Sequence, residues 1–104
     1  MIATTCIVES VEISDLYRLD PIQVFWSNRG AGQGRVTITC YDSAWTTYWN
    51  AMGDRTIQEF FEQADVGYLV DKLGYSQVMK QRKTDIAYLR RVVEAIQDYL
   101  LTAK

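Results

Sequence analysis

The sequence has no histidine and only two cysteines among its 104 residues, and both shortages exclude kinds of chemistry. Without histidine, no Ser-His or Cys-His nucleophile can form, and no imidazole base is available near neutral pH. Cys6 and Cys40 lie far apart in the sequence and form no C-x-x-C pair, so we expect no metal centre. We therefore expect a protein that is not an enzyme and needs no cofactor. Catalysis by paired carboxylates, with or without a metal, is the enzymatic alternative that remains.

Long apolar runs and a strong net charge are also missing. No run approaches the about 20 apolar residues of a membrane span, and the N-terminus lacks the basic and apolar segments of a secretory signal. We expect a cytoplasmic protein with no membrane partner. Its two cysteines are expected to be free thiols buried in strands, with a disulfide between neighbouring strands as the alternative. The net charge of −2 gives no general attraction to nucleic acid, and the length suits one domain, residues 1–104.

The N-terminal half has the period-two alternation that is typical of strands. Residues 5–14 are rich in β-branched side chains, Pro21 precedes an alternating run over residues 22–27, and residues 35–41 alternate most regularly. A glycine-rich loop over residues 28–34 joins the last two runs, so we predict an antiparallel hairpin. This loop is no P-loop, because it lacks the G-K-[ST] sequence and a strand rather than a helix follows it.

After residue 41 the apolar spacing becomes helical. We predict a helix over residues 43–52, ended by Gly53, whose apolar residues fall within an arc of roughly 100°: Trp45, Tyr48, Trp49 and Met52. A stripe of that width usually faces a core. A binding platform for bases or sugars is the alternative, because Tyr and Trp can expose a polar edge at the border of the stripe.

Three more helices are predicted from their caps and apolar spacing. Thr56 and Glu59 fit a capping box, Asp65 caps the next helix, and Thr84 or Asp85 starts the long last one. Strands first and helices after indicate an α+β fold, a small antiparallel sheet with an N-terminal hairpin packed by C-terminal helices. The last helix carries extra apolar width, which predicts a homodimer through it: Tyr88, Val92 and Tyr99.

Charged residues supply the candidate partner-binding sites. Arg29 and Arg35 flank the glycine loop, which either presents them to a partner or is a plain hairpin connection. Asp54 and Arg55 lie in a turn, which either exposes the pair or only shapes the chain. A basic cluster before and within the last helix is either a solvated face or a surface for a protein or nucleic acid: Lys80, Arg82, Lys83, Arg90 and Arg91.

The run ITCYDSAWTTYWNAMGDRTIQEFF, residues 38–61, resembles uncharacterised small proteins carried by bacteriophages and prophages. In these proteins a strand ending in C-Y precedes an A-W-x-x-Y-W-x-A-M-G helix and an R-T-x-x-E-F-F segment, and YLVDKL at residues 68–73 extends the likeness. The resemblance implies a phage or prophage context in a bacterial host, and it assigns no activity and no site residue. Small phage accessory proteins often bind and block host proteins, including defence nucleases and CRISPR complexes.

We therefore predict a small non-enzymatic phage or prophage protein that binds a host or phage protein, with inhibition of a host defence system of the CRISPR or restriction type as the specific form. The alternative is a nucleic-acid-binding accessory protein, which would place the basic cluster on phosphates and exposed aromatic rings on bases. Steep loss of affinity with salt would mark that alternative.

Overall fold

Four strands followed by three helices make up the fold of the computed structural model, which describes residues 1–75 and 83–103. The strands β1 (Glu9–Ile13), β2 (Ile22–Gly30), β3 (Gln33–Cys40) and β4 (Ser43–Trp49) form one antiparallel sheet in the order β1-β2-β3-β4. Each strand therefore pairs with its neighbour in the chain. The predicted α+β class and the predicted hairpin between β2 and β3 are confirmed.

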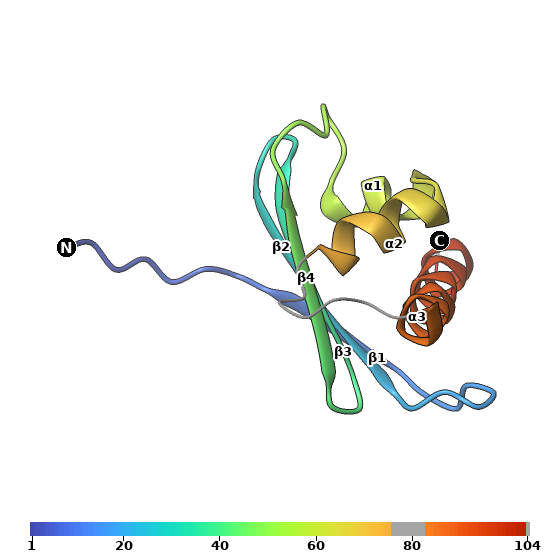
Figure 1. The fold of residues 1–104 in the computed structure, drawn as a ribbon. Helices are drawn as coiled ribbons and strands as arrows, with labels where there is room; N and C mark the ends of the chain where they lie inside the picture. Colours follow the sequence, from blue (N-terminus) through green and yellow to red (C-terminus); the bar gives the residue numbers. More distant parts are fainter. Residues whose placement is uncertain (76–82, 104) are drawn as a thin grey trace.

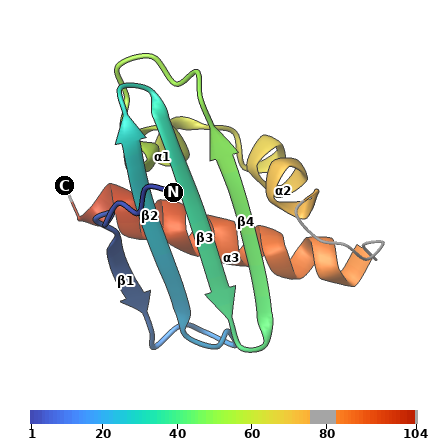
Figure 2. The same ribbon diagram turned by 90° about the vertical axis from the view of Figure 1, so that its left-hand side faces the viewer.

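All three helices lie on one side of the sheet: α1 (Ile57–Gln63), α2 (Val66–Gly74) and α3 (Lys83–Thr102) (Figure 1). The long α3 crosses behind the strands, as Figure 2 shows, with α1 behind the upper part of the sheet and α2 beside β4. The predicted capping box is present, because the Thr56 hydroxyl accepts from the Glu59 amide at 3.2 Å and the Glu59 carboxylate accepts from the Thr56 amide at 3.0 Å. Asp65 caps α2 in the same manner, through the Tyr68 amide.

The core fills the space between the sheet and the helices, and its buried side chains are apolar throughout the described residues. Alternate residues of β2, β3 and β4 enter it from one side, as the period of two requires. Phe61 of α1 is fully buried, and its ring meets Trp26 of β2 edge to face with centroids 5.5 Å apart. These contacts fix the helices on one face, so the other face of the sheet stays uncovered.

The predicted helix over residues 43–52 is wrong, because residues 43–49 form β4. Trp45 and Trp49 are four residues apart, a spacing that suits one face of a helix and equally one face of a strand. The run from Trp45 to Trp49 contains only aromatic and β-branched side chains, which favour a strand, and a two-residue turn at residues 41–42 returns it to β3. Gly53 accordingly lies in a turn, with φ of +70°, and does not end a helix. Both tryptophans are buried, as the core interpretation predicted, whereas Tyr48 points to the opposite face.

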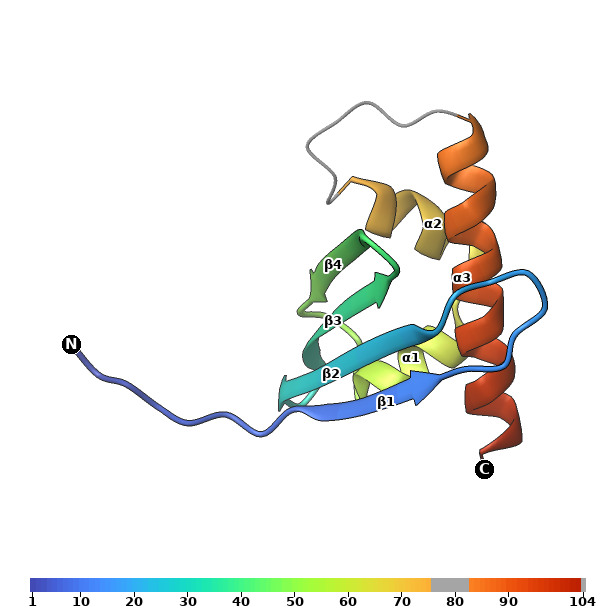
Figure 3. The same cartoon turned by 90° about the horizontal axis from the view of Figure 1, so that it is seen from below.

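Two N-terminal boundaries also differ from the prediction. The loop between β2 and β3 is shorter, because the strands continue to Gly30 and Gln33 with a bulge between Asn28 and Gly30. Strand β1 is confined to Glu9–Ile13, and residues 1–8 leave the sheet as an exposed segment that we call the arm (Figure 3). Cys6 is therefore an exposed thiol of the arm, while Cys40 is buried in β3 as expected, and both are free.

Of the three side chains predicted to widen the apolar face of α3, Tyr88 and Val92 pack within the chain, whereas Tyr99 is half-buried. Val92 is fully buried, and the Tyr88 ring packs against Trp45 with centroids 6.0 Å apart. The Tyr88 hydroxyl donates to the Cys40 sulfur at 2.9 Å. Because Tyr88 and Val92 are packed within the chain, they no longer argue for a second copy, and the homodimer stays a prediction.

Candidate functional site

The face of the sheet that points away from the helices is covered by no helix in the described part of the chain (Figure 2). We call it the open face. Hydroxyl and amide side chains dominate it, with two aromatic rings and few charges. The side chains that the strand alternation places there are these: Ser10, Glu12, Gln23, Phe25, Ser27, Arg35, Thr37, Thr39, Ala44, Thr46 and Tyr48.

Arg35 is held flat against the open face by its neighbours on β4. Its Nη1 donates to the Thr46 hydroxyl at 3.2 Å, and its guanidinium lies 5.7 Å from the centre of the Tyr48 ring. Arg35 and Tyr48 are directly opposite residues in the ladder between β3 and β4. The Tyr48 hydroxyl in turn donates to Oε1 of Gln33 at 3.4 Å. Cross-strand pairing therefore orders a cation, an aromatic ring and an amide at one end of the face.

These groups line a hollow of about 290 Å³, which we call the arginine hollow. Its lining residues are Arg29, Gln33, Arg35 and Tyr48. Donor groups outnumber acceptors there, because each guanidinium carries five N–H donors and no acceptor. Glu12 is the one carboxylate that the described strands place on the open face. It pairs with Gln23, whereas Arg35 pairs with Ser27, four residues further along β2. Along the strand direction, Glu12 is therefore about 13 Å from Arg35.

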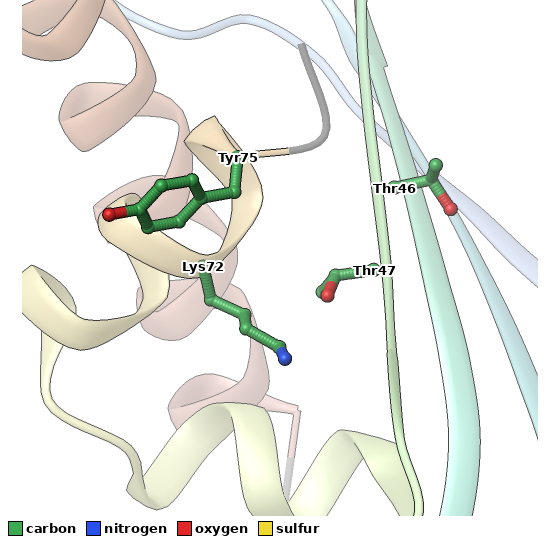
Figure 4. A pocket seen from close by; sticks show the side chains of 4 residues that line it. All are labelled: Thr46, Thr47, Lys72 and Tyr75. Atoms are coloured by element: carbon green, nitrogen blue, oxygen red, sulfur yellow. The ribbon is translucent and has the colours of Figure 1, made fainter.

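A second hollow, of about 320 Å³, lies beside β4 at the edge of the sheet. Figure 4 shows Thr47 projecting from β4 towards the Lys72 side chain of α2, while Thr46 projects from the opposite side of the strand and Tyr75 points away from it. Lys72 is the one charged group among its described lining residues. A single cation at a strand edge gives this hollow less chemical definition than the arginine hollow.

The candidate partner-binding residues are thus divided between different parts of the molecule. Arg29 and Arg35 meet in the arginine hollow, although the loop predicted to carry them is mostly strand. Arg55 lies in the turn before α1, where Nε donates to the Met52 carbonyl at 3.0 Å and the guanidinium covers the Phe60 ring at 4.9 Å. The shape-giving interpretation of this turn therefore accounts for Arg55, while Asp54 beside it is exposed.

The structure describes the side chains of only two members of the predicted basic cluster, Arg90 and Arg91. Arg90 forms an ion pair with Glu94 one turn along α3, at 3.7 Å between Nε and Oε1. Arg91 uses Nη2 to hold the loop between β1 and β2, donating to the Tyr17 carbonyl at 3.1 Å and the Arg18 carbonyl at 2.8 Å. Lys80 and Arg82 lie outside the described residues. Lys83 begins α3, and only its backbone is described.

Tyr48 and Gln33 belong to the hollow but were not among the predicted site residues. The helical period predicted for residues 43–52 places Tyr48 in the core stripe. A period of two would have placed it opposite Trp45 and Trp49, and therefore on the face that carries Arg35. The strand-forming composition of this segment was the available signal.

Other chemistry in the described residues is sparse. No group of three or more His, Cys, Asp or Glu side chains within residues 1–75 and 83–103 is placed to hold a metal ion. None of the described helices is both long and apolar enough to cross a membrane. Partial burial and the bond to Cys40 raise the pKa of the Tyr88 hydroxyl above its ordinary range. This tyrosine is thereby kept protonated, which suits a structural role.

A family model described as a phage family, Phage_phiTE_072, covers residues 1–97, which includes the sheet, α1, α2 and most of α3. No curated protein and no solved structure matches the chain.

Proposed function

The chain belongs to this phage protein family, and from that premise we propose that it is a non-enzymatic accessory protein that binds a partner protein through the open face of its sheet. The observation that carries the proposal is the arrangement of the layers. All three helices lie on one side, and the other side presents an ordered network of side chains to solvent.

The composition of the open face suits a protein interface. Tyr and Arg are enriched where proteins meet, because each offers a large contact area together with directed polar groups. Here the Arg35 guanidinium lies over the Tyr48 ring, and Thr37 and Thr46 share a hydrogen bond of 3.0 Å between their hydroxyls. A surface whose side chains already hold one another loses little conformational entropy when a partner orders it further.

The arm adds apolar contacts on the same side. Figures 1 and 3 show residues 1–8 leaving the sheet away from the helices. Glu9, where β1 begins, pairs with Trp26, so the arm departs beside the row that contains Arg35 and Tyr48. Its apolar side chains are exposed, with Ile2 93% and Ile7 86% exposed and Val8 about half. We propose that they pack against the partner that occupies the open face.

The distribution of charge favours a protein over nucleic acid. The described strands place two cations, Arg29 and Arg35, and one anion, Glu12, on the open face. The whole chain carries a net charge of −2. Nucleic-acid binding draws most of its affinity from many phosphate contacts. On α3, Arg90 already pairs with Glu94 and Arg91 is engaged by the loop before β2. The nucleic-acid alternative therefore has little described cationic surface to support it.

Membership of a phage family supports a partner from the bacterial host, in the bacterial cytoplasm. A compact binding module with one prepared face is suited to occupying the working surface of a larger complex. We propose, as the specific form of this function, that the partner belongs to a host defence system of the CRISPR or restriction type and is inhibited when it is bound.

Site-specific photo-crosslinking in the bacterial host tests the proposal. A photoreactive amino acid is placed at Gln23 or Ser10 on the open face, and at the exposed Asp98 of α3 as the matched control. We expect one host protein to be crosslinked from the two sheet positions and not from position 98. Equal crosslinking from all three positions, or none from the sheet, would overturn the proposal. A low-salt gel shift that depends on Arg35 would overturn it in favour of nucleic acid.

A further inference from the structure

We infer that the arginine hollow is a carboxylate-binding pocket that receives an Asp or Glu side chain of the partner protein. The inference rests on the proposed function, because it assigns a chemistry to one end of the open face. Two guanidinium groups, one amide and one phenol line the hollow, and no carboxylate is among its described lining residues. Such a set of donors attracts an anion.

The backbone accounts for the presence of Arg29 in the hollow. Asn28 is anchored to the start of α1, where Oδ1 accepts from the Ile57 amide at 2.8 Å and Nδ2 donates to Gln58 at 3.0 Å. The bulge between Asn28 and Gly30 follows at once. Because Asn28 is fixed on the helix side of the strand, its neighbour Arg29 is directed to the other side, towards Arg35. A bulge that redirects a side chain is a recurrent feature of binding sites.

The second arginine is positioned before any ligand arrives. Thr46 accepts from Nη1 of Arg35, and the guanidinium lies over the Tyr48 ring, so the side chain is held in place while its other N–H groups can bind a ligand. Gln33 accepts from Tyr48 through Oε1, which leaves its amide N–H₂ as a further donor beside the hollow. Prior ordering of this kind reduces the entropy that binding costs.

The size of the hollow suits one side chain. Its volume of about 290 Å³ lies at the lower limit of pockets that enclose whole small molecules, which span about 300–1,000 Å³. Two forked guanidinium groups match the two oxygens of a carboxylate. A phosphate group offers similar oxygens. The described strands of this face, however, carry two arginines and no lysine, so a nucleic-acid backbone would find few further cations there.

An NMR titration of the full chain tests the pocket with a defined probe. N-acetylglutamate amide is added while the Nε–Hε resonances of Arg29 and Arg35 are followed, and the neutral N-acetylglutamine amide serves as the matched probe. We expect saturable shifts with the glutamate probe only. Equal shifts with the glutamine probe, or no shift, would overturn the pocket. Tighter binding of inorganic phosphate than of the glutamate probe would overturn the carboxylate assignment.

Variants separate the pocket from general surface charge. Arg35→Gln should weaken binding of the glutamate probe about tenfold, the effect expected when a charge-assisted hydrogen bond is lost. Arg35→Lys should recover only part of this, because it keeps the charge but not the fork. Arg90→Gln on α3 removes an equal charge elsewhere and should leave the affinity unchanged. Unaltered binding by Arg35→Gln would contradict the inference.

The two proposals fail in different ways. If crosslinking from Gln23 succeeds while the glutamate probe does not bind, the open face is an interface and the carboxylate pocket is wrong. If the probe binds while no partner crosslinks to the sheet, the pocket is an anion site and the proposed function is wrong. Circular dichroism of each arginine variant confirms that the fold is retained, because both side chains are exposed.

Discussion

The indole nitrogen of Trp49 donates a hydrogen bond of 2.7 Å to the hydroxyl of Tyr68, which ties the end of β4 to the first turn of α2. Phe60 packs against both rings, with centroids 5.1 Å from Trp49 and 6.4 Å from Tyr68. Three elements are thus joined by one aromatic cluster. The bond satisfies a nearly buried N–H group that would otherwise lack a partner in the core.

Tyr68→Phe should therefore destabilise the protein while preserving the aromatic packing. We expect the free energy of unfolding to fall by about 1–2 kcal/mol, because the indole N–H loses its acceptor. Urea denaturation followed by tryptophan fluorescence measures the change. Tyr75→Phe, at the exposed end of the same helix, is the control and should have no measurable effect. Equal stability of both variants would contradict the structural role of the bond.

Gly32 and Gly53 provide a matched test of backbone packing. Both have φ of +70°, but a Cβ at Gly32 would lie 2.5 Å from the Gly53 carbonyl oxygen, whereas a Cβ at Gly53 would meet nothing within 4 Å. Gly53→Ala should cost about 1–2 kcal/mol, the strain of a left-handed alanine. Gly32→Ala should cost more, because backbone must move as well. Similar denaturation midpoints for the two variants would show that the turn yields easily.

Arg91→Gln should loosen the loop between β1 and β2. The side chain holds two carbonyls of this loop, so its loss should increase local opening about tenfold, the effect of removing one or two hydrogen bonds to a charged donor. Tryptic cleavage after Arg18 reports that opening. Arg90→Gln is the control, because it removes a neighbouring arginine whose ion pair is solvent-exposed. Trypsin should cleave this variant after Arg18 at the wild-type rate. Resistance of Arg91→Gln to trypsin would contradict the anchoring role.

Tyr88 should make stability fall at alkaline pH. Its pKa is raised by burial and by the Cys40 bond, so the folded state retains a proton that the unfolded state releases above about pH 10. The stabilisation is complete below that pH and is lost as the pH rises towards the folded-state pKa. In Tyr88→Phe, the free energy of unfolding measured by urea denaturation should fall less between about pH 9 and about pH 11, on either side of the ordinary tyrosine pKa. The exposed Tyr17→Phe should leave the decline unaltered.

Much of the fold could be predicted because local signals agree with it. The caps at Thr56 and Asp65 and the alternation of Val36, Ile38 and Cys40 each specify one conformation. Residues 43–49 were ambiguous because Trp45 and Trp49 satisfy both periods, and the pairing with β3 that decides between them is a tertiary contact. Side-chain composition favours the strand, whereas the spacing of Tyr48 and Met52 relative to the two tryptophans favours the helix.

The site was predictable only in part. Arg29 and Arg35 were singled out as charges beside a flexible loop, yet they meet because of a bulge and an Asn28 anchor on α1. Arg91 has the same residue type and exposure class as Arg90, and only the position of a distant loop makes it structural. A sequence pattern identifies such residues as charged and exposed. It does not identify their partners, which for Arg91 are carbonyl groups more than seventy residues away.

The unequal placement of the two thiols has a practical consequence for chemistry in solution. Cys6 in the arm is open to air oxidation and to maleimides, whereas Cys40 is only 1% exposed. In air, covalent pairs of molecules are expected to form through Cys6, so a reductant is needed whenever the oligomeric state is measured. Once Cys6 has been blocked, the rate at which Cys40 becomes alkylated reports how often the whole core opens.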